Sequence, residues 1–598
     1  MPKIFIKNIS KTIEYVAGND LLQILLENDI FVDNPCNGKG SCGKCNIRLL
    51  EGNLPKISET EEKFLSQEEI DLGIRLSCLV TPEEDIVIET LHKEGKYEIL
   101  TKGYIPEFEF NPGIHKKVFK VEKPTLENQI SFEDSICSSF GIKGLDLELL
   151  NIKEVIDEEV TGVFYGEDLI GIEANNTRDI LYGACVDIGT TTVVTSLVNM
   201  NTGEEITTDS IINPQKKFGL DVLTRITYEI ENPKEAKQKL QQEIVSAINE
   251  MIGNMCNESK INRKNIYEIS IAANSAMMHF LLGIDATSLG KSPYAPIFVR
   301  SKNILAKDIG IKVFKGARIY CLPSVSSYIG ADIVAGAYVC GLDKTMENIL
   351  FIDIGTNGEI VLSSNGKLLS CSCAAGPALE GMNISAGMRA ASGAIEDVII
   401  TEKGIELKVI GNEEGIGICG SGILAVVKEL ISIGLIKKNG AFIKKEILES
   451  TDYRYNMIQL DGKKREFVLK KAPKQLLITQ GDVRQVQLAK GAILSGFYAL
   501  LKQANINMSQ LNKVMIAGQF GAHLPVDSLV GTGILPEEVK EKIVYVGNSS
   551  KTGAYMALMS IDIKGKLEEL ANKMDYMELG ASEGYERLFA KCLLFNGE

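Results

Sequence analysis

Short strand-like segments separated by polar turns fill most of the first 95 residues. These segments are residues 3–7, 12–16, 46–50 and 85–90. Residues 20–28 instead place leucine and isoleucine at helical spacing, so we expect one helix among the strands. Residues 1–95 are therefore predicted to form a small β-rich domain.

The pattern changes twice before residue 181. Residues 96–113 combine prolines, glycines and aromatic residues without periodicity, which is typical of a linker. The aromatic residues leave open whether this linker docks on another part of the molecule or only covers local surface. Residues 114–180 alternate strand-like and charged segments and carry no catalytic constellation. We predict a small α+β middle domain that spaces the first domain from the rest of the chain.

The remaining residues, 181–598, contain one arrangement twice. An apolar strand ends in Asp187, turns through Gly-Thr and is followed by a second apolar strand, and the same arrangement recurs at Asp353. One such turn would be weak support, because tight turns favour these residues in any context. Two copies in matching strand contexts predict a duplicated domain.

Composition and charge narrow the class of protein. A chain of 598 residues with 45% hydrophobic and 24% charged residues has material for several domains with large cores. The net charge of −15 and the lack of a basic tract argue against a nucleic-acid partner. No uninterrupted apolar run is long enough to span a bilayer, so we expect no membrane partner. Thirteen cysteines without a signal peptide indicate a reducing compartment, so we expect a cytoplasmic protein.

Cysteines cluster in the first domain. Cys36, Cys42 and Cys45 follow a C-x5-C-x2-C pattern with glycines between them, and Cys78 follows at a distance. The glycines allow the loop to turn its amides toward cluster sulfurs. The spacing is that of a 2Fe–2S ferredoxin, and it lacks the second CxxC of a zinc ribbon. We predict that these four thiolates bind a 2Fe–2S cluster; a zinc site and chance clustering are the alternatives.

The duplicated turns offer ligands for Mg²⁺ and phosphate. A strand-end carboxylate suits Mg²⁺ or its waters, and the amides and hydroxyls of the turn suit phosphate oxygens. We predict that the two turns face each other and bind the β- and γ-phosphates of ATP. The predicted contacts are Gly189, Thr190, Thr191, Thr192, Gly355, Thr356, Asn357 and Gly358.

Other segments are predicted to border the same cleft. Gly420, Ser421 and Gly422 precede a predicted helix, where free amides suit anions. Glu380 follows a Gly-Pro turn, where it could orient the attacking water or equally cap a helix. Lys490 is expected within reach of the nucleotide.

Some candidate residues are expected to be structural. His279 lies in an apolar context, which is typical of a core histidine. Cys371, Cys373 and Cys419 lack metal-ligand spacing and are expected to be packing residues.

The pair of turns resembles the phosphate motifs of the superfamily of actin, sugar kinases and heat-shock chaperones. The resemblance implies a duplicated, ribonuclease H-like ATPase domain over residues 181–598. It also implies a later glycine-rich turn for adenosine, and the residues at that position are Gly518, Gln519, Phe520 and Gly521. The first domain resembles β-grasp ferredoxins, with cysteine spacing closer to the adrenodoxin type. The expected fold class is thus an α/β multidomain protein.

The combination resembles one family over essentially the whole chain. The blocks D-I-G-T-T-T, N-P-Q-x-x-F-G-x-D-V, D-I-G-T-N-G-E, G-P-A-L-E-G, G-I-C-G-S-G and L-A-K-G-A-I are similar to those of the reductive activators of corrinoid proteins. This resemblance implies ATP-dependent return of a Co(II) corrinoid protein to Co(I), with Asp187, Asp353 and Glu380 as catalytic residues. It further implies a low-potential electron donor such as a ferredoxin or flavodoxin. A homodimer is compatible with the resemblance, although no residue identifies an interface.

Three other functions stay open on the sequence alone. One is a metabolite kinase with an appended redox-sensing ferredoxin domain. The second is an ATP-dependent activator of a radical dehydratase, against which the C-x5-C-x2-C loop argues. The third is a nucleotide-dependent binding module with a structural zinc.

Overall fold

The computed structural model describes residues 2–16, 18–28, 30, 32, 38, 40, 43–91, 101, 103–152, 159–462, 464–472, 475–518 and 524–595. Two of the predicted cluster ligands, Cys36 and Cys42, lie outside these ranges, as do Gln519, Phe520 and Gly521 of the predicted adenosine turn. Among the described residues, none of the helices combines the length and the apolar character needed to cross a membrane.

The first domain is a five-stranded sheet in the order β2-β1-β5-β3-β4. Its strands are β1 (Lys3–Ile6), β2 (Lys11–Glu14), β3 (Asn46–Glu51), β4 (Ile74–Leu76) and β5 (Ile86–Thr90). Helix α1 (Leu21–Glu27) begins after Asp20, whose side chain accepts a hydrogen bond from Gln23 N at 2.9 Å. The apolar face of α1 is buried in the domain core. Two short helices, α2 (Glu59–Glu62) and α3 (Gln67–Asp71), follow β3. The parallel pairing of β1 with β5 and the packing of α1 on the sheet confirm the predicted β-grasp domain.

The described part of the linker docks on the C-terminal part of the chain, between residues 546 and 560. Gly103 forms a bridge with Gly547, and the Tyr104 amide donates to the Val546 carbonyl oxygen at 3.0 Å. Phe108 packs edge-on against Tyr555, with ring centroids 6.0 Å apart. Of the two alternatives for the aromatic residues of the linker, docking on another part of the molecule is therefore the one that the structure supports.

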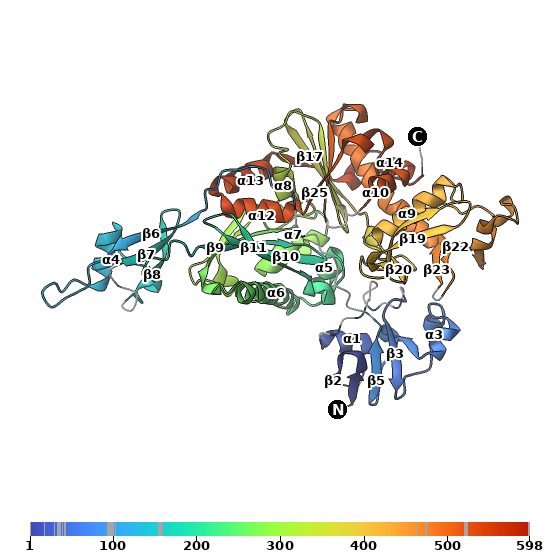
Figure 1. The fold of residues 1–598 in the computed structure, drawn as a ribbon, viewed down its shortest axis with the longest axis horizontal. Helices are drawn as coiled ribbons and strands as arrows, with labels where there is room; N and C mark the ends of the chain where they lie inside the picture. The colour runs from blue at the N-terminus through green and yellow to red at the C-terminus, as the bar shows by residue number, and fades with distance from the viewer. Residues whose placement is uncertain are drawn as a thin grey trace.

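A three-stranded antiparallel sheet with one helix follows the linker. The elements are β6 (Ile114–Lys120), α4 (Phe132–Phe140), β7 (Glu159–Tyr165) and β8 (Asp168–Ala174). This small α+β unit extends to one end of the molecule, whereas the first domain lies at the opposite side, below α9 (Gly420–Ser432) (Figure 1). The predicted spacer role is therefore wrong, because the first domain contacts the C-terminal part directly through Lys44 and Ile384.

Two six-stranded sheets form most of the remaining molecule, and five of the six strands follow the same order in both. The first has the order β11-β10-β9-β12-β14-β13, and the second has the order β25-β24-β15-β16-β17-β26. The sixth strand differs, because β13 lies beside β14 in the first sheet whereas β26 lies beside β17 in the second. In each, three antiparallel strands are followed by two parallel strands on the other side of the first strand. This repeated order confirms the predicted duplication. The strands are β9 (Tyr182–Ile188), β10 (Thr192–Asn199), β11 (Glu205–Ile212), β12 (Ile266–Ala273), β13 (Lys302–Leu305), β14 (Arg318–Cys321), β15 (Ile349–Ile354), β16 (Gly358–Ser364), β17 (Lys367–Cys373), β24 (Lys513–Ala517), β25 (Ile543–Gly547) and β26 (Met574–Tyr576).

Helices cover these sheets and join the two halves. Helix α12 (Ser549–Met559) packs on α8 (Ala331–Val339) and also on β9 and β12 of the first sheet, although it belongs to the second half. The long helix α6 lies against β10 and β11, and α10 lies against β16 and β17. The helices are α5 (Val222–Glu231), α6 (Ala236–Ser259), α7 (Ser275–Leu282), α8 (Ala331–Val339), α10 (Gln480–Ala504), α11 (Val526–Gly531), α12 (Ser549–Met559), α13 (Ile561–Lys573) and α14 (Tyr585–Cys592).

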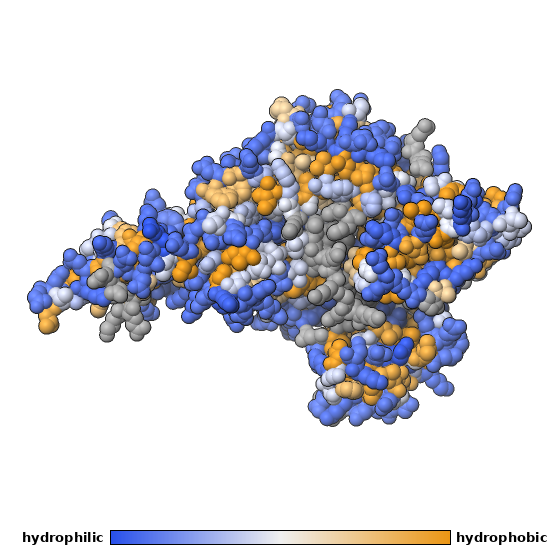
Figure 2. Space-filling model, viewed as in Figure 1, coloured by the Kyte–Doolittle hydropathy of each residue, from blue (hydrophilic) through white to orange (hydrophobic). Residues whose placement is uncertain are grey.

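Two small three-stranded sheets are inserted between β17 and β24. One has the order β19-β18-β20 and the other the order β21-β22-β23. Their strands are β18 (Ala394–Ile400), β19 (Ile405–Val409), β20 (Gly417–Ile418), β21 (Ile458–Asp461), β22 (Lys464–Lys470) and β23 (Leu476–Thr479). They lie with α9 at the same end of the molecule as the first domain (Figure 1). Polar residues cover much of the visible surface, and the first domain stands out as a separate lobe (Figure 2).

Candidate functional site

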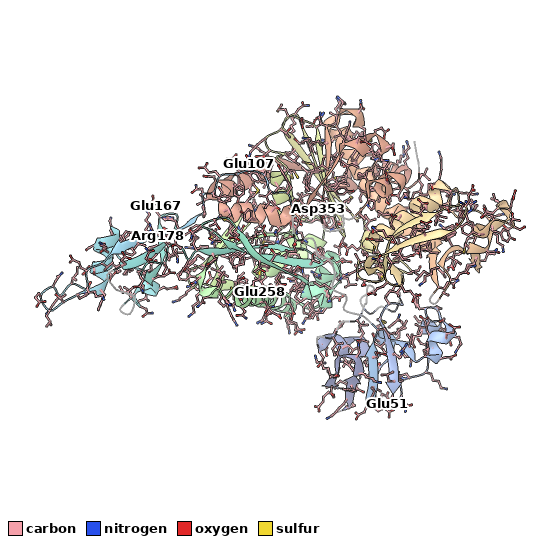
Figure 3. All side chains as sticks on the ribbon, viewed as in Figure 1. Glu51, Glu107, Glu167, Arg178, Glu258 and Asp353 are labelled. Carbon is pink, nitrogen blue, oxygen red and sulfur yellow. The ribbon has the colours of Figure 1, made fainter. Side chains whose placement is uncertain are left out.

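The two aspartate turns border one cavity between the halves of the duplicated domain. Asp187 lies near the end of β9 and Asp353 near the end of β15, and both line the cavity. Figure 3 places Asp353 near the middle of the molecule, between the two sheets. Seven of the eight predicted phosphate contacts also line it: Gly189, Thr190, Thr191, Thr192, Gly355, Thr356 and Asn357. The eighth, Gly358, is packed so closely on Cys373 that an added Cβ would lie 2.8 Å from its sulfur.

Asp187 is held by side chains from the far end of the chain. Its carboxylate accepts hydrogen bonds from Ser550 Oγ at 2.6 Å and from Asn548 Nδ2 at 2.9 Å. Burial raises the pKa of Asp187, while these two hydrogen bonds act in the opposite direction. Sequence reasoning did not find Asn548 or Ser550. The one local signal is that Asn548 is a good first residue for α12, whose Lys551 amide it caps at 2.9 Å.

Polar side chains from three other segments hold the first turn in place. Asn213 Nδ2 donates to the Gly189 carbonyl oxygen at 2.8 Å, and Arg225 Nη2 donates to that of Thr190 at 2.6 Å. Asn274 Nδ2 donates to the Thr190 hydroxyl oxygen at 3.0 Å. The turn is therefore fixed before any ligand arrives.

Glu380 joins the two turns. It lies at the end of the 3-10 helix η8 (Pro377–Glu380), it is almost completely buried, and its side chain caps none of the helices that the structure describes. Its carboxylate accepts hydrogen bonds from the hydroxyls of Thr191, at 3.4 Å, and of Thr356. Burial raises the pKa of Glu380, and the Thr356 hydrogen bond partly offsets this. The helix-capping alternative is therefore wrong for this structure, and a position between both phosphate turns remains.

Carboxylates gather in the cavity. Asp332, in the first turn of α8, and Glu359, in β16, line it together with Asp187 and Asp353. Burial, followed by repulsion from Asp187, raises the pKa of Asp332 to about 7, and burial with repulsion from Asp332 and Asp187 raises that of Asp353 to about 8. Burial also raises the pKa of Glu359 well above its usual value. Asp332 was missed because it carries no repeated motif and reaches the cavity only through tertiary packing.

This set of oxygen donors fits Mg²⁺ in one particular way. Within the part of the chain that the structure describes, no three acidic, histidine or cysteine side chains are close enough to bind one ion together. Mg²⁺ usually takes one or two carboxylates and completes its shell with water and substrate phosphates. Repulsion between buried carboxylates disfavours their ionised forms, and a cation would relieve it. The cavity therefore suits a magnesium nucleotide rather than a bare structural ion.

The other predicted nucleotide contacts lie in different surroundings. Gly518 lines the cavity at the end of β24, with a φ of +89° and no room for a side chain beside Asp353. Helix α9 begins at Gly420, earlier than expected, and Gly420, Ser421 and Gly422 do not line the cavity. A Cβ on Gly420 would lie 1.8 Å from the Leu379 carbonyl oxygen, so this glycine permits close packing. A nucleotide contact at 420–422 stays a prediction.

Lys490 lies away from the cavity. Its Nζ donates to the carbonyl oxygens of Cys592 at 2.8 Å and Leu594 at 2.6 Å, so the expected position near the nucleotide is wrong. His279 is confirmed as a core residue: it is fully buried, and its ring bonds the Ser275 carbonyl oxygen at 2.7 Å.

Of the four predicted cluster ligands, the structure describes Cys45 and Cys78, and both lie in the first domain. The sulfur atoms of Cys45 and Cys78 are 3.2 Å apart, as close as ligands of one small cluster would be. The neighbouring Cys78 lowers the pKa of Cys45 to about 7 although burial opposes this, and a thiolate is the form that binds metal. Cys371, Cys373 and Cys419 are buried in the C-terminal half, as expected of packing residues.

A β-grasp domain with a cysteine pair, joined to a duplicated actin-like domain with a carboxylate-lined cleft, defines an iron–sulfur protein with an ATPase-type domain. Comparison with protein families agrees with this class. Residues 4–83 match the 2Fe-2S iron-sulfur cluster binding domain, residues 182–345 match the RACo middle region, and residues 347–598 match the C-terminal ASKHA domain of RACo. The boundary between the last two falls between α8 and β15, where the two sheets divide.

A solved structure and two curated proteins are similar over most of their length. The structure of a reductive activator for corrinoid, iron-sulfur protein superposes with a TM-score of 0.72 at 30% identity, covering 100% of this chain and 99% of that one. The chain therefore belongs to the family of reductive activators of corrinoid proteins. Corrinoid activation enzyme RamQ of Eubacterium limosum is 28% identical, over 94% of this chain and 93% of its own. The [Co(II) methylated amine-specific corrinoid protein] reductase of Methanosarcina barkeri is 24% identical, over 68% of this chain and 76% of its own.

Proposed function

We propose that this protein uses ATP to return an inactive Co(II) corrinoid protein to Co(I), passing one electron through its first domain. The observation that carries the proposal is the cleft in which Asp187 and Asp353 flank one cavity, in a chain that also holds the cysteine pair. The electron donor is proposed to be a low-potential protein such as a ferredoxin or flavodoxin. The domain division at 1–95, 96–113, 114–180 and 181–598 and a cytoplasmic location belong to the same proposal.

Each group of residues has a distinct role in this proposal. Gly189–Thr192 and Gly355–Asn357 donate amide and hydroxyl hydrogens to phosphate oxygens. Mg²⁺ held beside Asp187 and Asp353 would neutralise charge on the phosphates. Glu380, placed between both turns, orients the attacking water, and the turn at Gly518 contacts the adenosine.

The first domain supplies the redox part. A 2Fe–2S cluster on Cys36, Cys42, Cys45 and Cys78 would carry one electron, at roughly −400 mV if it behaves as in plant-type ferredoxins. Such a centre does not easily reduce a Co(II) corrinoid. ATP can assist only by favouring a state of the complex in which the cobalt is easier to reduce. In our proposal this state is reached when the two halves close around the nucleotide.

Two single variants test whether the two sites have separate roles. Asp353→Asn is expected to lose nucleotide binding or turnover at least tenfold while its cluster is still reduced by a chemical reductant. Cys45→Ser is expected to lose the cluster spectrum while it still binds nucleotide by calorimetry. Both variants should fail in ATP-dependent cobalt reduction. Full activity in either variant would contradict the proposal.

A further inference from the structure

The first domain contacts the C-terminal half through the residue before a predicted cluster ligand. Lys44 Nζ donates hydrogen bonds to the carbonyl oxygens of Ile384 at 3.0 Å and Ser385 at 2.8 Å. Lys44 directly precedes Cys45, so the contact is made beside the cysteine pair itself. This agrees with the position of the first domain below β20 and β23 (Figure 1).

The segment that receives Lys44 also reaches the nucleotide cleft. Glu380, a few residues before Ile384, accepts hydrogen bonds from Thr191 and Thr356 of the two phosphate turns. The turn that carries Glu380 is internally bonded, with the Met382 amide donating to the Pro377 carbonyl oxygen at 3.1 Å. A Cβ on Gly381 would lie 2.1 Å from the Met388 carbonyl oxygen, so this turn is also closely packed. A displacement of Glu380 would therefore be passed on to Ile384 rather than absorbed.

The linker attaches the first domain to the other wall of the cleft. Gly103 pairs with Gly547, and the next residue, Asn548, donates to Asp187 at 2.9 Å. The first domain is thus connected at two places to segments that hold the aspartate and threonine side chains of the cleft.

A triphosphate would change the surroundings of Glu380. The Thr191 and Thr356 hydroxyls each have one hydrogen to donate, and both donate to this carboxylate. When these hydrogens turn to phosphate oxygens, Glu380 loses both donors while a polyanion lies beside it. A buried carboxylate that loses its donors next to like charge must either take up a proton or shift, and in our proposal the turn that carries Glu380 shifts.

We propose that Lys44 is a latch that holds the first domain against Ile384 and Ser385 in the nucleotide-free protein, and that ATP in the cleft releases this latch through Glu380. The released domain is then free to reach the corrinoid partner. This inference rests on the proposed ATP binding, but it concerns domain release and not the reduction itself.

Small-angle X-ray scattering of the full-length, cluster-loaded protein under anaerobic conditions tests the latch. Each protein is measured with and without Mg²⁺ and a non-hydrolysable ATP analogue. The wild type is expected to increase its maximum dimension on addition of the nucleotide. Lys44→Met is expected to be extended in both states, and Lys44→Arg, which keeps the donors, should behave as the wild type. Lys56→Met is the matched control, because Lys56 is an exposed lysine of the same domain.

The outcomes separate the latch from the proposed function. Melting temperature and the visible spectrum of the cluster verify that each variant is folded and loaded. Equal dimensions of Lys44→Met and wild type without nucleotide would overturn the latch. A wild type that binds the analogue by calorimetry but keeps its dimensions would overturn the release step alone. Absence of binding by calorimetry would contradict the proposed function as well.

Discussion

Glu61 shows how a single buried charge positions the predicted cluster site. It is fully buried, and it accepts hydrogen bonds from Arg75 at 2.9 and 3.0 Å and from the Leu76 amide at 3.1 Å. Burial raises the pKa of Glu61, but its hydrogen bonds, led by that from Arg75, lower it on balance. Arg75 and Leu76 form the strand that leads to Cys78, so the ion pair fixes one predicted ligand.

Removal of this charge should destabilise the first domain. Glu61→Gln leaves the buried Arg75 without its carboxylate, which costs about 3–5 kcal/mol for a buried pair. The matched control is Glu69→Gln, because Glu69 makes the same capping contact with Ser66 but is only half-buried. The loss of stability in this control should be below about 1 kcal/mol. Thermal unfolding by circular dichroism measures both. Equal losses in the two variants would contradict this account.

The same ion pair gives the stability of the domain a pH dependence of known sign. Because the pKa of Glu61 is lowered in the folded state, its contribution is complete above the ordinary glutamate value of about 4.3. The contribution is lost as the pH falls through the lowered folded-state pKa. Glu61→Gln should therefore lose less stability than the wild type between about pH 5 and 3. Parallel pH curves of the two proteins would contradict this prediction.

The sequence predicted those site residues that belong to a local pattern. Asp187 and Asp353 were predictable because each closes an apolar strand inside a repeated motif. Asn548, Ser550 and Asp332 were not, because they reach the cavity from distant helices and no periodicity marks them. Lys490 was misplaced for the same reason, since its sequence neighbours do not reveal that its ammonium group binds the chain end.

Close packing of helices α8 and α12 holds the two halves of the duplicated domain together. A Cβ on Gly553 would lie 2.5 Å from Ala335 Cβ and 2.8 Å from Ala335 Cα, so the helices could not approach as they do with a larger residue. Gly336 of α8 likewise leaves no room beside Phe351 of β15. The repeated strand–turn–strand arrangement was predictable from the sequence, but this helix crossing was not, because it depends on which small residues meet in space.

Two glycine-to-alanine substitutions in neighbouring helices should change the stability of the protein in opposite directions. Gly553→Ala forces α12 and α8 apart and should cost about 1–3 kcal/mol, as overpacking usually does. Gly565→Ala in α13 meets no atom within 4 Å and should stabilise by about 0.5–1 kcal/mol, because alanine loses less backbone entropy in a helix. Thermal unfolding of both variants measures the two changes in stability. An increase in stability in Gly553→Ala would contradict the packing argument.

At the scale of the whole molecule, residues of both halves of the duplicated domain line the cleft, and the first domain lies against the inserted sheets. The sequence predicted the fold of the parts but not their placement. Lys44 and Ile384 are far apart in the chain, and a single lysine near a carbonyl leaves no pattern to detect. The small α+β unit does not separate the first domain from the rest of the chain, because the described part of the linker runs along β25 and leads to the opposite end.

A ligand that binds between the halves should stabilise the duplicated domain by mass action. At a concentration of 100 times Kd, Mg-ATP should add about 2.7 kcal/mol to its unfolding free energy. The increment should vanish in Asp353→Asn and on chelation of Mg²⁺, and it should persist in Cys45→Ser. Denaturant titration with and without Mg-ATP measures it. An increment that is unchanged in Asp353→Asn would place the nucleotide elsewhere.

Anaerobic absorbance of Co(II) corrinoid proteins mixed with this protein and a low-potential reductant tests the central claim most directly. We predict that the Co(I) band develops with Mg-ATP and stays absent without it, for at least one corrinoid protein. We also predict that Cys45→Ser and Asp353→Asn each abolish it. Formation of Co(I) at the same rate without ATP, or no Co(I) with any corrinoid protein while ATP is consumed in the presence of a small metabolite, would contradict the proposed activity.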